Sequence, residues 1–138
     1  MEKSVLLTIL SVQTMEETEE TRLVTDGILR VTDDALELSY AESELTGLVG
    51  TTTTFRIEPE KVTLQRSGKV QSKMVFTVGK EDQSLYDMGF GALMITIRTD
   101  RIENDLTENG GKLTVAYDIS IEDEVTGSIE YQIDVRLK

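Results

Sequence analysis

A strict alternation of apolar and polar residues constrains this chain more than any other feature. In the closing segment SIEYQIDVRLK, apolar side chains occupy every second position: Ile129, Tyr131, Ile133, Val135 and Leu137. Residues 112–122, KLTVAYDISIE, repeat the pattern. A period of two is typical of antiparallel strands with one buried face and one solvated face. No segment of ten or more residues has a convincing helical period, so we expect an all-β protein.

Seven further segments are predicted to be strands because they are rich in β-branched residues and are separated by turn residues. They are residues 5–12, 21–31, 35–42, 52–58, 61–67, 69–78 and 92–99. Such short spacing predicts about eight to ten antiparallel strands in a single domain, residues 1–138. Closure of these strands into an up-and-down barrel would remove both exposed sheet edges. We therefore expect a closed antiparallel barrel.

The turns can be deduced from register, because paired residues in a hairpin must point to the same side of the sheet. An odd loop such as Ser67–Lys69, with Gly68 in the left-handed conformation, aligns the apolar residues on either side of it. Asn109–Gly110 predicts a two-residue turn that pairs Leu106 with Leu113. The last hairpin needs an odd loop, with Gly127 as its left-handed residue, so that Ile121 opposes Ile129.

The same register directs Arg66 towards the core, two residues beyond Leu64. On the third predicted strand the inward row passes from Tyr40 to Glu42 and Glu44. An unpaired buried charge is very costly, so Arg66 needs a partner or a wet cavity. Three arrangements remain open. Arg66 forms an ion pair with Glu42 or Glu44, or these groups line the polar end of a ligand cavity, or early strand ends leave them in solvent.

Composition excludes several kinds of chemistry. The chain has neither cysteine nor histidine, which rules out disulfides, thiol nucleophiles, Cys/His zinc sites and histidine-based catalysis. The net charge of −12 argues against a nucleic-acid or anionic membrane partner. No cofactor or metal site is predicted, and no segment is long and apolar enough to span a membrane. We expect a soluble, cytoplasmic protein.

The charge is unevenly distributed along the chain. Residues 56–80 hold six basic and two acidic residues, so this stretch carries +4 while the remainder carries −16. A basic surface of this kind could meet an anionic ligand, but strands lying beside acidic neighbours explain it more simply. Elsewhere, Glu42 and Glu44 resemble a glycosidase acid pair only weakly, because the chain has 26 acidic residues and no tryptophan.

Several separate motifs resemble those of the YwiB-like family of bacterial proteins. They are YAESELTG and GTTTT in residues 40–54, VTLQRSGK and MVF in residues 62–76, SLY in residues 84–86, GAL in residues 91–93, and GKL in residues 111–113. The resemblance covers nearly the whole chain in order. It implies a calycin-like, lipocalin-type barrel in a bacterial cytoplasm, and it brings no activity with it.

Two functions from different classes are compatible with these features. The first is a non-enzymatic barrel that binds a small molecule among apolar walls with a charged end. Its predicted site is Tyr40, Glu42, Glu44, Leu64, Arg66, Met74 and Phe76. The second is a structural or protein-interaction module, with a homodimer as one candidate assembly, whose barrel is filled by its own side chains. An enzyme ranks third, since only carboxylates, tyrosine, lysine or arginine could act.

Overall fold

The computed structural model describes residues 2–14, 16–42, 49–87, 91–121 and 124–138, and its regular elements in these ranges are all β-strands. They are β1 (Glu2–Thr14), β2 (Thr18–Val31), β3 (Leu36–Ala41), β4 (Thr51–Ile57), β5 (Val62–Gly68), β6 (Ser72–Phe76), β7 (Glu81–Asp87), β8 (Ala92–Asn104), β9 (Gly111–Ile121) and β10 (Glu124–Leu137). The all-β prediction is confirmed.

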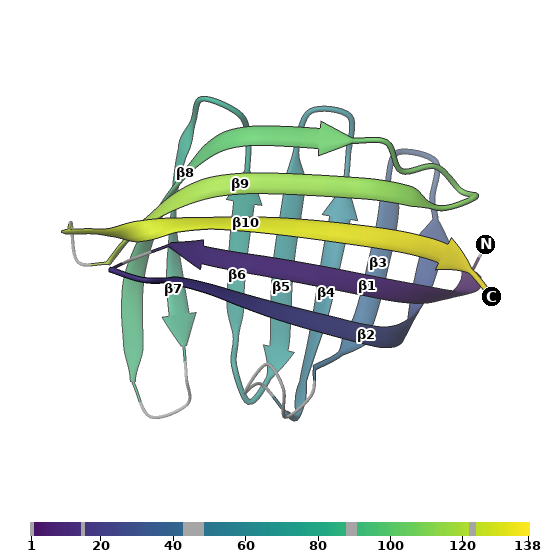
Figure 1. Ribbon diagram of the computed structural model, residues 1–138, viewed down its shortest axis with the longest axis horizontal. Helices are drawn as coiled ribbons and strands as arrows, with labels where there is room; N and C mark the ends of the chain where they lie inside the picture. Colours follow the sequence, from purple (N-terminus) through teal and green to yellow (C-terminus); the bar gives the residue numbers. More distant parts are fainter. Residues whose placement is uncertain (1, 15, 43–48, 88–90, 122–123) are drawn as a thin grey trace.

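Every pair of strands that follow one another in the chain is also paired in the sheet except β6 and β7, and β1 pairs in addition with β10. The order is β6-β5-β4-β3-β2-β1-β10-β9-β8-β7, so β1 and β10 pair in the middle of the sheet. Their ladder begins at Val5 opposite Leu137 and ends at Thr14 opposite Ser128. The two ends of the chain therefore lie side by side (Figure 1), and the Lys138 amide donates to the Ser4 carbonyl at 3.2 Å.

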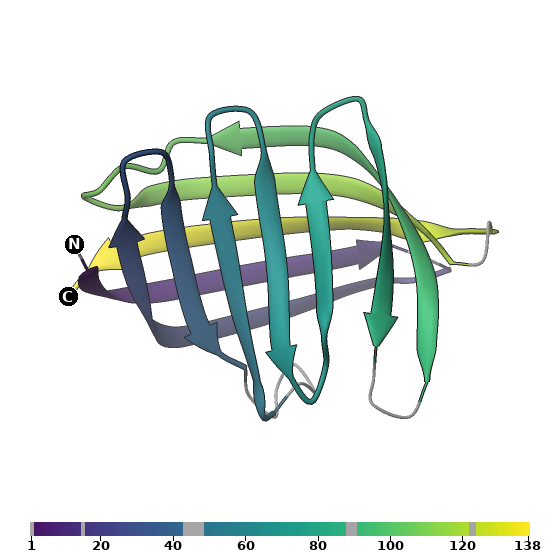
Figure 2. The same ribbon diagram turned by 180° about the vertical axis from the view of Figure 1, so that it is seen from behind.

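The sheet folds over into two layers whose strands run crosswise to each other (Figures 1 and 2). The long strands β1, β2, β9 and β10 form one layer, and the short strands β3 to β7 form the other (Figures 1 and 2). Packing of this kind needs strands that pass from one layer to the other. β8 is such a strand, because its register against β9 shifts between Thr99 and Arg101. A bulge bends a strand and increases its twist.

The barrel is nearly closed, and its last junction is made by side chains. β6 and β7 lie at the two ends of the strand order and share no backbone ladder among the described residues. Instead, the Val75 amide donates to an Asp82 carboxylate oxygen at 3.3 Å, and the Ser84 hydroxyl donates to the Lys73 carbonyl. We call this junction the β6–β7 seam. It satisfies edge groups of β6 that a strand partner would otherwise satisfy.

Side chains fill the middle of the barrel. Two inward rows cross the short strands, Leu38–Phe55–Leu64–Met74 and Leu36–Ile57–Val62–Phe76. Phe76 packs against Tyr117 of the facing layer with ring centroids 4.7 Å apart. Phe55, Leu64 and Phe76 have no water-accessible surface at all. A cavity that could hold a water molecule would leave accessible surface on its walls, so the space around these three residues is packed.

The sequence missed β7, and the seam explains why. The positions of β7 that turn towards the barrel carry Asp82 and Ser84, whose polar side chains bond the backbone of β6. The expected alternation of apolar and polar residues is therefore absent from this strand. The predicted strand count of eight to ten still includes the observed ten.

Three predicted turns differ in detail from the structure. The loop between β5 and β6 is odd, as expected, but it has five residues rather than three, because Arg66 pairs with Ser72. Gly68 does take a positive φ of 125°, and a Cβ on it would lie 2.2 Å from the Gly50 carbonyl oxygen. Glycine is therefore required at this position.

The turn at 107–110 lies one residue earlier than predicted. Thr107 and Gly110 form a bridge, so the central residues are Glu108 and Asn109 rather than Asn109 and Gly110. Leu113 opposes Asn104 and not Leu106. The prediction was wrong because Gly110 and Gly111 both have positive φ, which moves the reversal back by one residue.

The last hairpin corrects its register by a bulge instead of an odd loop. Ile121 opposes Glu124, so the predicted pairing of Ile121 with Ile129 is wrong. The register then shifts between Val125 and Gly127, and Ile129 opposes Tyr117. The bulge supplies the extra residue that keeps apolar side chains on the inner face.

Candidate functional site

A polar row crosses the short strands next to the apolar rows. Tyr40 of β3 pairs with Thr53 of β4, Thr53 pairs with Arg66 of β5, and Arg66 pairs with Ser72 of β6. All four residues have relative exposures of 9% or less. The β-branched threonines 51–54 form the start of β4, and this places Thr53 in the row. We call Tyr40, Thr53, Arg66 and Ser72 the polar row.

Arg66 has an acidic partner and a phenolic partner inside the barrel. Its Nε lies 3.8 Å from Oε2 of Glu42, and the two side chains are 9% and 2% exposed. Its Nη2 donates to the hydroxyl of Tyr131 on β10 at 3.1 Å. Thr53 donates to the same Glu42 oxygen at 2.6 Å. The first arrangement expected for Arg66, a buried ion pair, is therefore present with Glu42, while Glu44 lies outside the described residues.

The polar row also contains atoms whose hydrogen-bonding capacity is unused. Three buried side-chain atoms in the described residues have no hydrogen-bond partner, namely Arg66 Nε, Ser72 Oγ and Thr99 Oγ1. Two of the three belong to residues that face each other across β5 and β6. Buried polar groups nearly always have a partner, so an unsatisfied pair at one place in the barrel needs an explanation.

The environment of the polar row fixes its protonation. Burial, reinforced by the nearby Glu42 carboxylate, raises the pKa of Tyr40 well above its ordinary value. Burial acts to lower the pKa of Arg66, but Tyr131, Glu42 and Tyr40 outweigh it and the pKa is raised overall. Tyr40 is therefore a neutral phenol and Arg66 a cation throughout the physiological range. Neither group is poised to exchange a proton near neutral pH.

The remaining predicted site residues are apolar and closely packed. Leu64 and Phe76 have no accessible surface, and Met74 is 4% exposed. All three belong to the main hydrophobic core. The structure thus brings the described members of the predicted site together on neighbouring strands, with the charged members at one end and the apolar members towards the middle.

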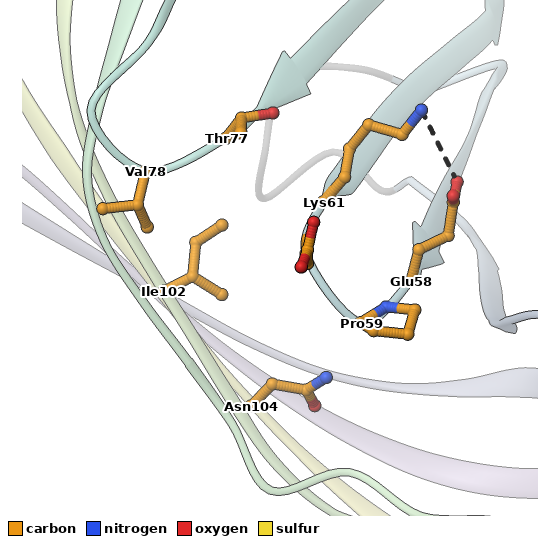
Figure 3. A pocket seen from close by; sticks show the side chains of 8 residues that line it. Glu58, Pro59, Lys61, Thr77, Val78, Ile102 and Asn104 are labelled. Carbon is orange, nitrogen blue, oxygen red and sulfur yellow. Dashed lines mark ion pairs between the residues drawn. The ribbon is translucent and has the colours of Figure 1, made fainter.

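A hollow lies at the opposite end of the short strands, and the sequence did not indicate it. Its volume is about 500 Å³, and it is lined by the loop residues Glu58, Pro59, Glu60 and Lys61, the residues Thr77 and Val78 after β6, and Ile102 and Asn104 of β8. Figure 3 places Val78 and Ile102 on one side and Pro59, Glu58 and Lys61 on the other. We call it the end pocket. The one sequence feature that could have indicated the pocket is Val78, an apolar residue that continues the inward alternation of β6 beyond the end of the strand. In the structure Val78 is 55% exposed.

The basic stretch is partly neutralised by acidic neighbours. Arg56 pairs with Glu37 at 2.9 Å and with Glu58 at 3.2 Å, and Lys61 lies 3.9 Å from Glu58. Among the described residues, three of the six basic side chains in this stretch, Arg56, Lys61 and Arg66, therefore form ion pairs with carboxylates. This favours the simpler interpretation, in which basic strands lie beside acidic ones.

The described ranges hold no group of three or more metal-ligating side chains. Within the same ranges, no helix is long and apolar enough to cross a membrane.

Comparison with known proteins identifies the family. Residues 7–133 match the family described as "Domain of unknown function (DUF1934)". The chain belongs to this family. The chain is also similar to the "Uncharacterized beta-barrel protein YwiB" of Bacillus subtilis (strain 168), with 33% identity over 100 residues that cover 72% of this chain and 69% of the relative.

A solved crystal structure has the same fold. The crystal structure of the ywiB protein from Bacillus subtilis matches with a TM-score of 0.89 and 27% sequence identity, over 99% of this chain and 93% of that chain. The resemblance to the YwiB-like family and the predicted β-barrel are both confirmed. The description of the Bacillus subtilis relative names a β-barrel, and neither description names an activity, so function has to be argued from the site.

Proposed function

We propose that this protein is a non-enzymatic binder of a small molecule, which it holds at the polar row. The observation that carries the proposal is the pair of unsatisfied atoms, Arg66 Nε and Ser72 Oγ. Both belong to residues that are at least nine-tenths buried, and these residues face each other on paired strands. A single acceptor oxygen of a ligand would satisfy the Nε–H and the Ser72 hydroxyl together.

Charge narrows the class of ligand. Glu42 already balances the charge of Arg66 inside the barrel. A carboxylate or phosphate would add an uncompensated negative charge to a buried site, which is costly. We therefore expect a neutral acceptor such as a carbonyl, an amide or a hydroxyl. Tyr40 and Tyr131 would offer hydroxyl groups and aromatic faces beside it.

Packing narrows the size of the ligand. Leu64 and Phe76 have no accessible surface, so the ligand is expected to occupy the polar end and not to extend into the middle of the barrel. Met74 is the apolar member of the predicted site that can best adapt, because its unbranched side chain changes rotamer easily. Glu44 remains part of the proposed site as an expectation from the sequence.

The test is to identify what the protein carries when it is purified from a bacterial host. Denaturing mass spectrometry of the extract would compare wild type with Ser72→Ala, and Gln65→Ala on the outer face of β5 would be the matched control. We expect a neutral, oxygen-bearing compound with the wild type and the control, reduced about tenfold in Ser72→Ala. The proposal fails if no compound is found and a high-resolution crystal structure shows only water at Arg66 Nε.

A second function is supported by a different observation. Leu85 of β7 and Met94 of β8 are paired on the outer face, and they are 54% and 44% exposed. Such an apolar pair is suited to a protein contact, and the simplest partner is a second copy of the chain. Light scattering over a range of protein concentrations would detect the dimer. Leu85→Ser should abolish it, and a monomer at every concentration would exclude this function.

A cytoplasmic location also remains a proposal. A chain without cysteine is suited to a reducing compartment, and the comparisons above come from a bacterium. Fractionation of bacterial cells with an antibody to the protein would test it, and recovery with the membrane or the medium would contradict it.

A further inference from the structure

We propose that the end pocket is a second binding site and that it takes a small organic cation, namely a primary amine with a short apolar chain. The end pocket is lined by the loop between β4 and β5 and by the residues after β6, whereas the polar row crosses the other ends of these strands, so the pocket is separate from the site proposed above. Its volume of about 500 Å³ falls in the range of known small-molecule sites.

One wall of the end pocket is suited to an apolar chain. Val78 is 55% exposed, although aliphatic side chains of this size are usually buried. Ile102 lies beside it across the pocket from Pro59 (Figure 3). A chain of four or five carbons placed between these side chains would remove apolar surface from water on both sides.

The charges around the pocket favour a cation. Glu58 is already neutralised, because Arg56 Nε lies 3.2 Å and Lys61 Nζ 3.9 Å from its Oε1. Glu60 also lines the pocket, and it makes no ion pair or side-chain hydrogen bond with any described residue. Its carboxylate is therefore available to an incoming ammonium group.

Neutral polar groups complete the site. Thr77 lines the pocket and has a hydroxyl oxygen, and the side-chain Oδ1 of Asn104, which accepts from the Leu106 amide at 3.0 Å, has a second lone pair. An ammonium group has three donors and no acceptor, so it matches a carboxylate and two neutral oxygens. The lining includes two acidic residues, Glu58 and Glu60, and one basic residue, Lys61, so its own charge also favours a cation over an anion.

The test uses pentylamine as the probe and the methyl NMR signals of Val78 and Ile102 as the readout. Pentanol and pentanoate are the matched neutral and anionic probes of the same length. We expect pentylamine to shift both methyl signals to saturation, pentanol to bind more weakly, and pentanoate to cause no shift. Higher salt should weaken the binding of pentylamine, because the carboxylate is exposed to screening.

Two variants separate a specific contact with Glu60 from a general effect of charge. Glu60→Gln should weaken binding of pentylamine about two- to fivefold, as expected for loss of an exposed ion pair. Glu19→Gln on β2 removes the same charge away from the pocket and should change nothing. The proposal is overturned if pentylamine and pentanol bind equally, if Glu60→Gln binds like wild type, or if no probe shifts the two methyl signals.

Discussion

Arg66 and Glu42 form the residue-scale feature with the largest energetic consequence. Both side chains are almost fully buried, so neither charge can be hydrated if its partner is removed. We predict that Glu42→Gln destabilises the protein by about 3–5 kcal/mol, because it leaves the Arg66 charge uncompensated and weakens the acceptor of Thr53. Glu2→Gln, which removes the exposed partner of Arg30, should cost less than about 1 kcal/mol.

Urea unfolding of the single and double variants would measure these free energies. Combining Arg66→Met with Glu42→Gln should cost less than the sum of the two single changes, because the double variant buries no charge. Additive costs would mean that the two side chains do not interact.

Tyr40 gives a residue-scale prediction about alkaline pH. Its pKa is raised by burial in the folded state, whereas in the unfolded chain a tyrosine loses its proton near pH 10. The folded state retains a proton that the unfolded state releases, so this contribution is complete below about pH 10 and is lost progressively as the pH rises further. The slope should be about 1.4 kcal/mol per pH unit.

The measurement is the free energy of unfolding of wild type and Tyr40→Phe between pH 9 and pH 11. The difference between the two proteins isolates Tyr40 from the other groups that titrate in this range. Parallel curves would contradict the assignment.

The sequence predicted the direction of the Arg66 side chain but not all of its contacts. Register alone directed Arg66 inward and brought it to the acidic end of β3, since side chains alternate strictly along a strand. The partnership with Tyr131 could not be predicted, because it joins two layers that cross and that share no local register. Val78 continues the inward alternation of β6 along the sequence, but β6 ends at Phe76 and Val78 lines the end pocket.

The seam between β6 and β7 is the element-scale feature that departs most from a regular barrel. Two hydrogen bonds between side chains of β7 and the backbone of β6, made by Asp82 and Ser84, replace a backbone ladder there. We predict that Asp82→Ala accelerates hydrogen exchange of the Val75 amide roughly three- to tenfold, because the amide loses its acceptor. Gln83→Ala, on the exposed face between these residues, is the control.

Hydrogen exchange followed by NMR would resolve the Val75 amide from those of the neighbouring strands. The Leu64 amide, inside the ladders of β5, should exchange at its original rate. An unchanged Val75 rate in Asp82→Ala would show that this bond does not hold the seam.

Elements were predictable where burial alone shaped the sequence. Nine strands were predicted, two from strict alternation of apolar and polar residues and seven from β-branched residues between turn residues. β7 was not predicted, because its inward residues Asp82 and Ser84 are polar and hydrogen-bond the backbone of β6. The register corrections at β8 and β10 were also hidden, because a bulge adds one residue without a sequence pattern of its own.

The pairing of β1 with β10 is the feature that governs the whole molecule. It joins segments separated by nearly the full length of the chain, whereas the other ladders join strands adjacent in sequence. A circular permutant could link Lys138 to Met1 and open the chain at Gly79–Lys80, which cuts no described ladder. Its ten strands would then follow one another in sheet order, and we predict that it refolds faster than wild type.

Stopped-flow refolding of the permutant would test this prediction. A second permutant, opened at Asp33–Asp34 between β2 and β3, separates two strands that do share a ladder and should gain less. Equal refolding rates for the wild type and the first permutant would show that the β1–β10 pairing does not limit folding.

The position of β10 has a consequence during protein synthesis. Among the ten strands, β1 leaves the ribosome first and β10 last, yet the two lie together at the centre of the sheet. Until β10 emerges, β1 presents an unpaired edge with Val5, Leu7 and Ile9 and no strand on that side. The nascent chain therefore has an aggregation-prone edge during most of translation. We expect a chaperone to be needed before β10 is synthesised.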